Sequence, residues 1–435
     1  MKVDPVGARP GRDARQARRN LKPIVGGQSV SLFGDYIAFF TLPYFMLALT
    51  GRAVDLGLTA AAETLPMLLF GLAAGVFLDR RRRLGRALIG ADLVRAAAFG
   101  FLAIAVGMSW ISPLIVFGVA FLVGSMAVVF DSGLQSYMTQ SLDEADLLKA
   151  NAELGLARTI TLSLGPLAAG LVVALAGGFA LAFGLNAATF VVSAGLMAIV
   201  RPIKTLPQRK REPFRRAISS GLSVLFADKR LRWGTLGGTL TNLVFQPLEA
   251  LLVLFVATEV LGLKTLEQGL TEKGLLIGLF FALQAAIGSI GVAFAGRVAK
   301  RLPLGSMYIV GLAMLGGGFL VVAVLGSWWA VIPAGVAITG VTWVNVSLVT
   351  MRQKLAPPEQ MGRVIAASRT LAWAGLPIGA AVGGMLAGIV GILPVYVGGS
   401  IGVLAVAAFL TTTPLMKDPL MGVSTSDQRT NGPAS

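Results

Sequence analysis

Five acidic residues lie inside long apolar stretches of this chain, where an ionised side chain is costly. They are Asp35, Glu63, Asp92, Asp131 and Glu249. The chain contains no histidine and no cysteine, which removes imidazole bases, thiol nucleophiles, disulfides and the usual zinc ligands. Proton transfer would therefore fall to carboxylates. A carboxyl group that faces a partly dry cavity can take up a proton from one side and release it to the other.

The chain is too apolar to be a soluble protein. Of its 435 residues, 55% are hydrophobic and 13% are charged, and the mean hydropathy is +0.78. Apolar runs of about 20 residues recur along most of the length, and each is long enough to cross a hydrocarbon core. Because backbone groups in lipid must form hydrogen bonds within their own segment, these runs are predicted to be helices. We predict twelve spans at 23–48, 55–78, 86–107, 111–137, 150–176, 179–200, 233–259, 273–296, 304–326, 328–350, 364–389 and 392–413.

The basic residues gather on one side of the predicted topology. With both termini in the cytoplasm, the cytoplasmic segments and their edges carry 31 of the 37 Lys and Arg residues. The outer loops carry only Arg52, Lys264 and Lys273. This asymmetry follows the positive-inside rule. The net charge of +16 is therefore assigned to topology, and no nucleic-acid partner is expected. The first 20 residues lack the apolar stretch of a signal peptide.

A polar interruption at residues 201–232 divides six spans from six. Its first half is basic and contains three prolines, which predicts a cytoplasmic linker, and residues 215–226 are expected to form a helix on the membrane surface. The predicted domains are a disordered cytoplasmic tail at 1–20, an N-terminal six-helix bundle at 21–200, the linker at 201–232, a C-terminal six-helix bundle at 233–414 and a cytoplasmic tail at 415–435.

The two halves carry related segments. RTITLSLGP at 158–166 matches RTLAWAGLP at 369–377, since each has Arg-Thr and a proline eight positions after the arginine. GLAAGVFLDRRRR at 71–83 has a weaker counterpart in GSIGVAFAGRVAKR at 288–301. A chance match of short patterns is the alternative. Two six-helix halves in parallel duplication are the expected plan of one large class of secondary transporters.

These segments resemble the major facilitator superfamily. The stretch 71–83 is similar to the signature loop between the second and third helices of that superfamily, with spaced small residues, Asp-Arg and further basic residues. SLFGD at 31–35, LLKANAELGLARTITLSLGPLAAG at 147–170 and GRVIAASRTLAWAGLPIGAAVGG at 362–384 resemble its macrolide-efflux and enterobactin-exporter-like branch. The resemblance, from about residue 22 to 413, implies an all-α membrane protein with twelve transmembrane helices in two pseudo-symmetric six-helix bundles.

The same resemblance assigns gating roles. Gly71 and Gly75 are four residues apart, so they share a helix face and permit close packing. In the superfamily the loop that follows forms a salt-bridged latch, which implies that Asp79 and Arg80 take part in gating. The predicted gating set is Gly71, Gly75, Asp79, Arg80, Arg158 and Arg369.

Gly165, Pro166 and Pro377 are predicted to kink the fifth and eleventh spans. GPLAAG at 165–170 resembles the Gly-Pro part of a motif of antiporters in the superfamily. Of the upstream glycines in the family pattern, only Gly155 is close to the required spacing. An antiporter motif and an ordinary proline kink both remain open.

Polar stripes run along spans one, four, seven and ten, and the family architecture lines its central cavity with the same four helices. A long polar stripe is unfavourable against lipid, so we expect these stripes to face a shared aqueous cavity. The predicted cavity residues are Gln28, Ser31, Gln135, Asn242, Gln246, Trp343 and Asn345. The candidates for proton coupling are Asp35 and Glu249, followed by Glu63 and Asp131. Asp92 and Arg95 are three residues apart and are expected to form a structural pair.

These features favour a secondary transporter that exports amphipathic small molecules by proton antiport. The alternatives are an uptake permease or lysophospholipid-type flippase on the same fold, and a non-transporting membrane assembly factor, against which the polar stripes argue. No GxxxxGK[ST] phosphate loop and no enzymatic constellation is present in the sequence. We expect a monomer in the cytoplasmic membrane of a bacterium, with a small-molecule substrate, no metal and no cofactor besides the proton gradient.

The charge asymmetry predicts that the loop 201–232 is cytoplasmic. A cysteine introduced by Ser219→Cys should therefore react with a membrane-impermeant maleimide only after the cells are opened. Gly51→Cys, placed in a predicted outer loop, is the matched control and should react in intact cells. Labelling of the Ser219→Cys variant in intact cells would contradict the topology.

Overall fold

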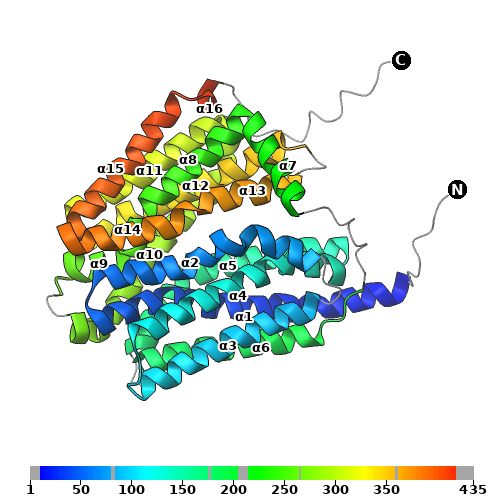
Figure 1. The fold of residues 1–435 in the computed structure, drawn as a ribbon, viewed down its shortest axis with the longest axis horizontal. Coiled ribbons are helices and arrows are strands. Elements are labelled where there is room, and N and C mark those ends of the chain that lie inside the picture. The colour runs from blue at the N-terminus through cyan, green and yellow to red at the C-terminus, as the bar shows by residue number, and fades with distance from the viewer. Residues whose placement is uncertain are drawn as a thin grey trace. The chain divides into compact units, whose positions relative to one another are not determined.

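In a computed structural model of the chain, the described residues are 10–79, 84–174, 178–203, 214–263, 266–357 and 361–417. Every regular element within these ranges is a helix (Figure 1). The chain forms two compact units. The first consists of Met1–Gly51, Ala62–Glu212 and Thr265–Ala282, and the second of Arg52–Ala61, Pro213–Lys264 and Leu283–Ser435.

The first unit is a bundle of antiparallel helices around an aromatic core. Within it α3 packs against α4 and α6, and α1 packs against α5 and α6. The ring of Phe99 stacks on those of Phe183 and Phe190, with centroid separations of 6.1 and 6.0 Å. The helices are α1 (Pro10–Thr50), most of α2 (Ala53–Asp79), α3 (Leu84–Gly107), α4 (Pro113–Ser141), α5 (Glu144–Ala174), α6 (Gly178–Ile199) and the start of α10 (Leu266–Arg301).

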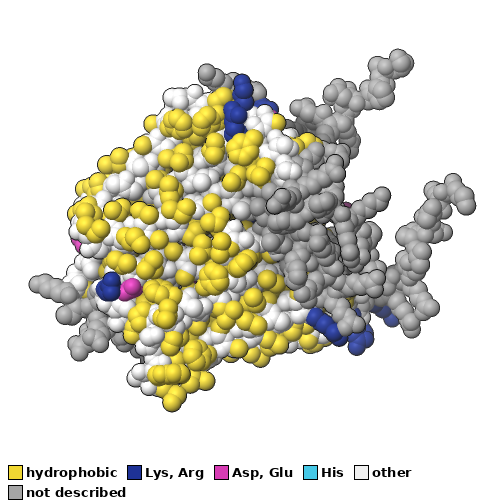
Figure 2. All heavy atoms as spheres, viewed as in Figure 1, with side chains coloured by type: hydrophobic (Ala, Val, Ile, Leu, Met, Phe, Trp, Pro, Cys, Tyr) yellow, Lys and Arg dark blue, Asp and Glu magenta, His cyan; other side chains and the backbone are white. Residues whose placement is uncertain are grey.

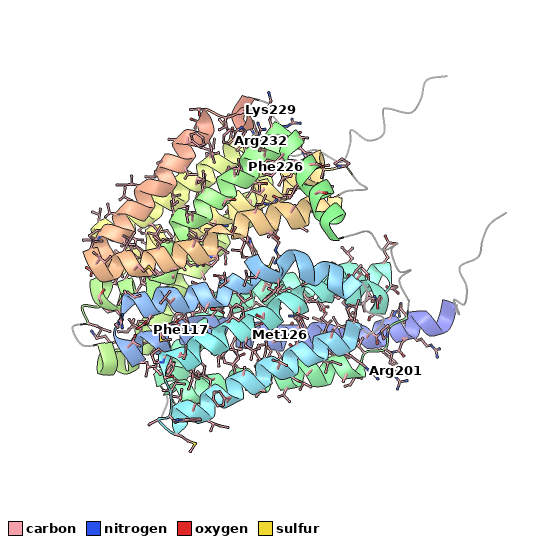
Figure 3. All side chains as sticks on the ribbon, viewed as in Figure 1. Phe117, Met126, Arg201, Phe226, Lys229 and Arg232 are labelled. Carbon is pink, nitrogen blue, oxygen red and sulfur yellow. The ribbon has the colours of Figure 1, made fainter. Side chains whose placement is uncertain are left out.

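Helix α1 begins earlier than the sequence predicts. Residues 10–20, expected to be part of a disordered tail, form its first turns. Asn20 makes a buried capping contact: its Nδ2 donates to the carbonyl oxygens of Ser141 (2.8 Å) and Arg201 (2.7 Å), where α4 and α6 end. These bonds satisfy carbonyls that have no partner within their own helices. The labelled Arg201 marks this end of the first unit in Figure 3.

The second unit combines straight helices with two broken ones. Within it α11 packs against α12 and α15, and α8 packs against α14 and α15. Its elements are α7 (Phe214–Ala227), α8 (Lys229–Ala250), α9 (Leu252–Phe255), the π-helical η1 (Val256–Val260), the rest of α10, α11 (Leu304–Leu325), η2 (Trp328–Ala330), α12 (Val331–Leu355), α13 (Met361–Trp373), α14 (Gly375–Val390), α15 (Ile392–Thr411) and α16 (Pro414–Lys417).

Helix α7 lies within the predicted linker and packs against α8 and α13. Leu225 of α7, Leu231 of α8 and Val364 of α13 are buried together in one apolar cluster. Asp228 caps α8 by accepting hydrogen bonds from the backbone of Arg230 and Leu231, which is the expected role of an N-cap aspartate. Helix α8 therefore begins at Lys229, so residues 229–232 belong to a helix and not to the linker. Figure 3 shows Phe226, Lys229 and Arg232 around this junction.

Two of the predicted spans are interrupted in the second unit. The seventh is bent by 42° between Lys229–Ala250 and Leu252–Val260, just after Pro247. The eleventh is divided into α13 and α14 at Ala374, three residues before Pro377. Proline lacks a backbone N–H, so the break at Ala374 lies in the turn where Pro377 removes a donor from the helical hydrogen-bond ladder.

Ten helices in the described part of the chain are long and apolar enough to cross a membrane, and the bent pair brings the number to eleven. The remaining predicted span corresponds to α5, whose apolar part is the shorter helical segment Leu164–Ala174. Large apolar side chains point outward from both units, including Ile104, Leu114, Val324 and Ile389, each more than 60% exposed. Figure 2 shows that hydrophobic side chains cover most of the described surface on the visible face, as expected for helices in contact with lipid.

Glycines permit close contact of helix backbones within each unit. In the second unit, Gly375, Gly379 and Gly383 occur every four residues on α14, and a Cβ atom at any of them would overlap α8. In the first unit, a Cβ atom at Gly278 would lie 2.6 Å from the carbonyl oxygen of Pro166. Small residues at this spacing let transmembrane helices approach closely, and that contact is their main source of association.

The α8–α14 contact predicts that a larger residue in place of a glycine destabilises the protein on α14 but not at an uncrowded glycine of α15. Gly383→Val places methyl groups against Pro247 and should lower the free energy of unfolding by about 1–3 kcal/mol. Gly398→Val on α15 is the control, because nothing lies within 4 Å of a Cβ atom there. Thermal unfolding in detergent measures both, and an equal loss of stability would argue against this packing.

Candidate functional site: a charged cluster and a polar stripe

Asp35 of α1 meets Asp92 and Arg95 of α3 in the first unit. Arg95 Nη2 forms a close ion pair with Asp92 Oδ1, and Arg95 Nη1 lies 3.5 Å from Asp35 Oδ2. The side chains of Arg95 and Asp92 are 3% and 0% exposed, whereas that of Asp35 is 35% exposed. Arg95 is therefore a buried cation shared by two carboxylates, of which only Asp35 is accessible.

Groups from two further helices hold the ion pair in place. Ser193 Oγ of α6 donates a 2.7 Å hydrogen bond to Asp92 Oδ2. The guanidinium carbon of Arg95 lies 4.1 Å from the ring centroid of Phe190 and 4.9 Å from that of Phe130. Aromatic faces attract a cation through their quadrupole, more strongly where water is absent. Contacts with α3, α4 and α6 thus hold the arginine in place independently of Asp35.

Gly34 explains how Asp35 reaches this cluster. A Cβ atom at residue 34 would overlap the side chains of Asn186 and Thr189 on α6. Only glycine lets α1 lie so close to α6, and the next residue then faces Arg95. The Gly-Asp pair in SLFGD therefore combines a packing position with a charged one.

The other predicted polar residues of this unit differ in their surroundings. Asp131 of α4 and Glu63 of α2 are close enough to interact electrostatically with Asp35. Asp131 is exposed, as is Gln135 one turn later, and Glu63 is half-buried. Gln28 and Ser31 are buried, and Gln28 Oε1 and Ser31 Oγ have no hydrogen-bond partner among the described residues. Unpaired buried oxygens of this kind are suited to bind water or a ligand.

The polar stripe of α8 contacts the broken helix α13–α14. Asn242 Nδ2 donates to the carbonyl oxygen of Ala372 at 2.7 Å, and Thr239 Oγ1 donates to that of Leu371 at 3.0 Å. One turn earlier, the hydroxyls of Thr235 and Ser368 are 2.7 Å apart. The amide of Asn242, expected in the cavity, thus donates to a carbonyl oxygen next to the helix break.

The remaining candidate residues of the second unit also differ in their surroundings. Gln246 is buried against Gly379, and its Oε1 atom has no partner within the described ranges. Glu249 is exposed in the last turn of α8. The Trp343 indole, expected in the cavity, donates to the Gly291 carbonyl oxygen of α10 at 3.3 Å. The exposed Asn345 donates to Val341 in its own helix.

The predicted gating residues are only partly described. Gly71 and Gly75 lie on α2, but the surroundings of Gly75, the side chain of Asp79 and the whole of Arg80 are outside the described residues. Arg158 is exposed on α5. Arg369 is half-buried, with its guanidinium carbon 4.2 Å from the ring centroid of Trp373.

The predicted kink residues behave differently in the two units. Helix α5 continues through Pro166, and Gly165 lets it approach Tyr36 of α1. The break near Pro377 is accompanied by the side-chain caps from α8. The two prolines therefore occupy matching sequence positions without producing the same local structure.

The contact of Arg95 with Asp35 is the functional feature that the sequence did not indicate. The spacing of Asp92 and Arg95 predicts a pair on one helix, as found. Asp35 lies 60 residues before Arg95 in the sequence, and no local pattern links it to the arginine. Ser193 gave no signal either, because an isolated serine in a transmembrane helix is common.

The contact between α8 and α13 can be tested at Asn242. Asn242→Leu keeps the volume but leaves the Ala372 carbonyl without its donor, which should lower the free energy of unfolding by about 1–3 kcal/mol. Asn345→Leu is the matched control, because that side chain is exposed and bonds only to its own helix. Thermal unfolding in detergent should separate the two, and equal midpoints would mean that the Asn242 bond does not support the break.

Known proteins resemble this chain in sequence and in fold. Macrolide efflux protein A of Streptococcus pyogenes is 26% identical over 380 residues, covering 85% of this chain and 89% of that protein. An uncharacterized MFS-type transporter of Sinorhizobium fredii is 27% identical over 351 residues, covering 80% and 83%.

The fold is shared with solved transporters. A bacterial homologue of the iron transporter ferroportin, in an inward-facing state, superposes with a TM-score of 0.70 at 19% identity and covers 91% of this chain and 98% of its own. The nucleoside transporter NupG gives 0.71 at 12% identity, covering 92% and 99%. The family model of the Major Facilitator Superfamily matches residues 24–380. The protein therefore belongs to the Major Facilitator Superfamily and is a multi-pass membrane transporter of small molecules.

Proposed function

We propose that this transporter exports amphipathic small molecules from a bacterial cell by alternating access, in exchange for protons. The observation that carries the proposal is the Asp35 carboxylate, which is one-third exposed and lies 3.5 Å from a buried arginine. An accessible carboxylate beside a fixed cation can exist in a charged and a neutral state without rearrangement of the surrounding helices. This property is required of a proton carrier, and with no histidine in the chain a carboxylate must provide it.

The direction of transport is supported by the relatives. Two of those described as macrolide efflux protein A, from Streptococcus pyogenes and Enterococcus faecalis, are 26% identical to this chain. Export rather than uptake is therefore the proposed direction, and a macrolide is a suitable first probe. The proposed setting is the cytoplasmic membrane, with both termini and the loop 201–232 inside, as the distribution of Lys and Arg favours.

Glu249 is the proposed coupling residue of the second unit. It is exposed one residue before α8 ends, next to the 42° bend. The oxygens of Gln28, Ser31 and Gln246 that have no partner among the described residues are proposed to contact substrate or cavity water. Asp79 and Arg80, and separately Arg158 and Arg369, are proposed to take part in gating.

Transport into proteoliposomes tests the coupling. Wild-type protein should accumulate a radiolabelled macrolide against its gradient when a pH difference is imposed. Asp35→Asn and Glu249→Gln should lose this accumulation, and at least one should retain exchange of labelled for unlabelled macrolide, because exchange requires no net proton movement. Glu153→Gln is the control, since Glu153 pairs with Lys149 on the surface of α5.

Two outcomes would contradict the proposal in different ways. If both single variants keep pH-driven accumulation, the proton site lies elsewhere or the driving ion is not a proton. If wild-type protein does not move the macrolide, a susceptibility panel in a strain without its own pumps should identify another exported compound; failure to protect against any would argue against export.

A further inference from the structure

Both carboxylate oxygens of Asp92 have partners, and this distinguishes its role from that of Asp35. One of its oxygens pairs with Arg95 and the other accepts the hydrogen bond of Ser193. Its side chain is fully buried. A carboxylate with both oxygens satisfied and no access to water is a poor site for proton exchange. Asp92 is therefore a permanent counter-ion, and the pair with Arg95 is electrically neutral.

Asp35 has a different relation to the same arginine. Its Oδ2 atom lies at 3.5 Å from Arg95 Nη1, which is longer than a charge-assisted hydrogen bond. The attraction between the two is therefore mainly electrostatic, and it disappears when Asp35 becomes neutral. The exposed edge of Asp35 is accessible to a proton, and Arg95 has Asp92 as a second partner when Asp35 is neutral.

The other charged groups around Asp35 increase its dependence on Arg95. Glu63 from α2 and Asp131 from α4 are both acidic, and Asp92 from α3 is paired already. Helix α6 contains no ionisable residue. Where α5 meets α1 next to Asp35, Gly165 packs on Tyr36. Among the described residues, Arg95 is thus the one cation that acts on Asp35, and the other charged groups that act on it are acidic.

We propose that Arg95 is a positioning residue for the proton step: Asp92, Ser193 and two aromatic rings fix its guanidinium, and Asp35 pairs with it only while ionised. The step is simple in chemical terms. A proton from water forms an O–H bond on Asp35, its ion pair with Arg95 is lost, and no other bond is made or broken. Release of the proton restores the pair. This inference rests on the proposed role of Asp35 in proton-coupled transport.

The experiment follows the protonation of Asp35 directly and needs no substrate. Infrared difference spectra of the purified, full-length protein in detergent are recorded across the pH range in which it stays folded. The carbonyl stretch of a protonated carboxyl group that is absent in Asp35→Asn reports on this residue. The double variant Asp92→Asn/Arg95→Gln removes both charges of the neutral pair, so it avoids leaving a lone charge buried.

In the double variant the midpoint of the Asp35 band should move to higher pH, because the cation that is removed lies against Asp35 and outweighs the anion, Asp92, that is removed with it. Arg95→Lys retains the charge and should give a smaller shift. Ser193→Ala retains every charge, so it should lower thermal stability but leave the pH midpoint of the Asp35 band nearly unchanged. Asp35→Asn should leave the thermal midpoint of unfolding less affected than Arg95→Gln, since Asp35 is the looser partner.

An unchanged midpoint in a folded double variant would overturn the proposal and reduce Arg95 to a structural residue. So would the lack of any band that depends on Asp35. These results are independent of the transport assay. If the band shifts as expected while Asp35→Asn retains pH-driven transport, the pairing with Arg95 stands and the coupling role of Asp35 fails.

Discussion

The ion pair between Arg95 and Asp92 is the interaction on which the first unit depends. A charge inside the membrane costs several kcal/mol unless it is paired, and an unpaired arginine at this depth would not be retained. Both members of the pair belong to α3, but the residues that contact them come from other helices: Ser193 and Phe190 belong to α6, and Phe130 belongs to α4. The helices that surround the pair are thus placed around a common charge, and α1 then brings Asp35 to its accessible edge.

The second unit solves a related problem without charge. Its eleventh predicted span is broken, and a helix break exposes carbonyl oxygens that lipid cannot satisfy. Thr239 and Asn242 of α8 provide the missing donors. They can reach the break because Gly375 and Gly379 let α14 lie directly on α8. Polar side chains on one helix and glycines on the next are therefore two parts of a single arrangement. The stripe predicted to face a water-filled cavity thus has a structural use at Thr239 and Asn242.

The two units differ although their sequences contain matching segments. RTITLSLGP lies in a continuous helix, and RTLAWAGLP contains the break between α13 and α14. The difference comes from the neighbours. Tyr36 packs against Gly165 in the first unit, whereas Thr239 and Asn242 donate to carbonyl oxygens next to the break in the second. A short repeat can therefore indicate duplication, but the local structure of each copy is decided by the helix beside it.

Most of the fold was predictable because lipid restricts the backbone so strongly. An apolar run long enough to cross the hydrocarbon core must be a helix, so the helix positions followed from composition. The polar interruption before α8 and the family followed from composition and short motifs. The tail was predicted to extend over residues 1–20, whereas α1 begins at Pro10; local polarity gave no sign of the contacts of Asn20, whose partners lie at the ends of α4 and α6. The membrane carboxylates could be identified in the sequence because a charge inside an apolar span is costly, so an acidic residue there is rare.

What the tertiary structure alone decided is which of these polar groups are paired. Asp35 and Asp92 look alike in sequence, each an acid in an apolar span, yet one is saturated and buried and the other is accessible. Asn242 and Gln246 occupy the same stripe, yet one caps a helix break and the other has an unpaired oxygen. A helical period determines which face a residue occupies. The partner on that face is supplied by another helix at a distance of many residues, and only the packing of the helices brings the two together.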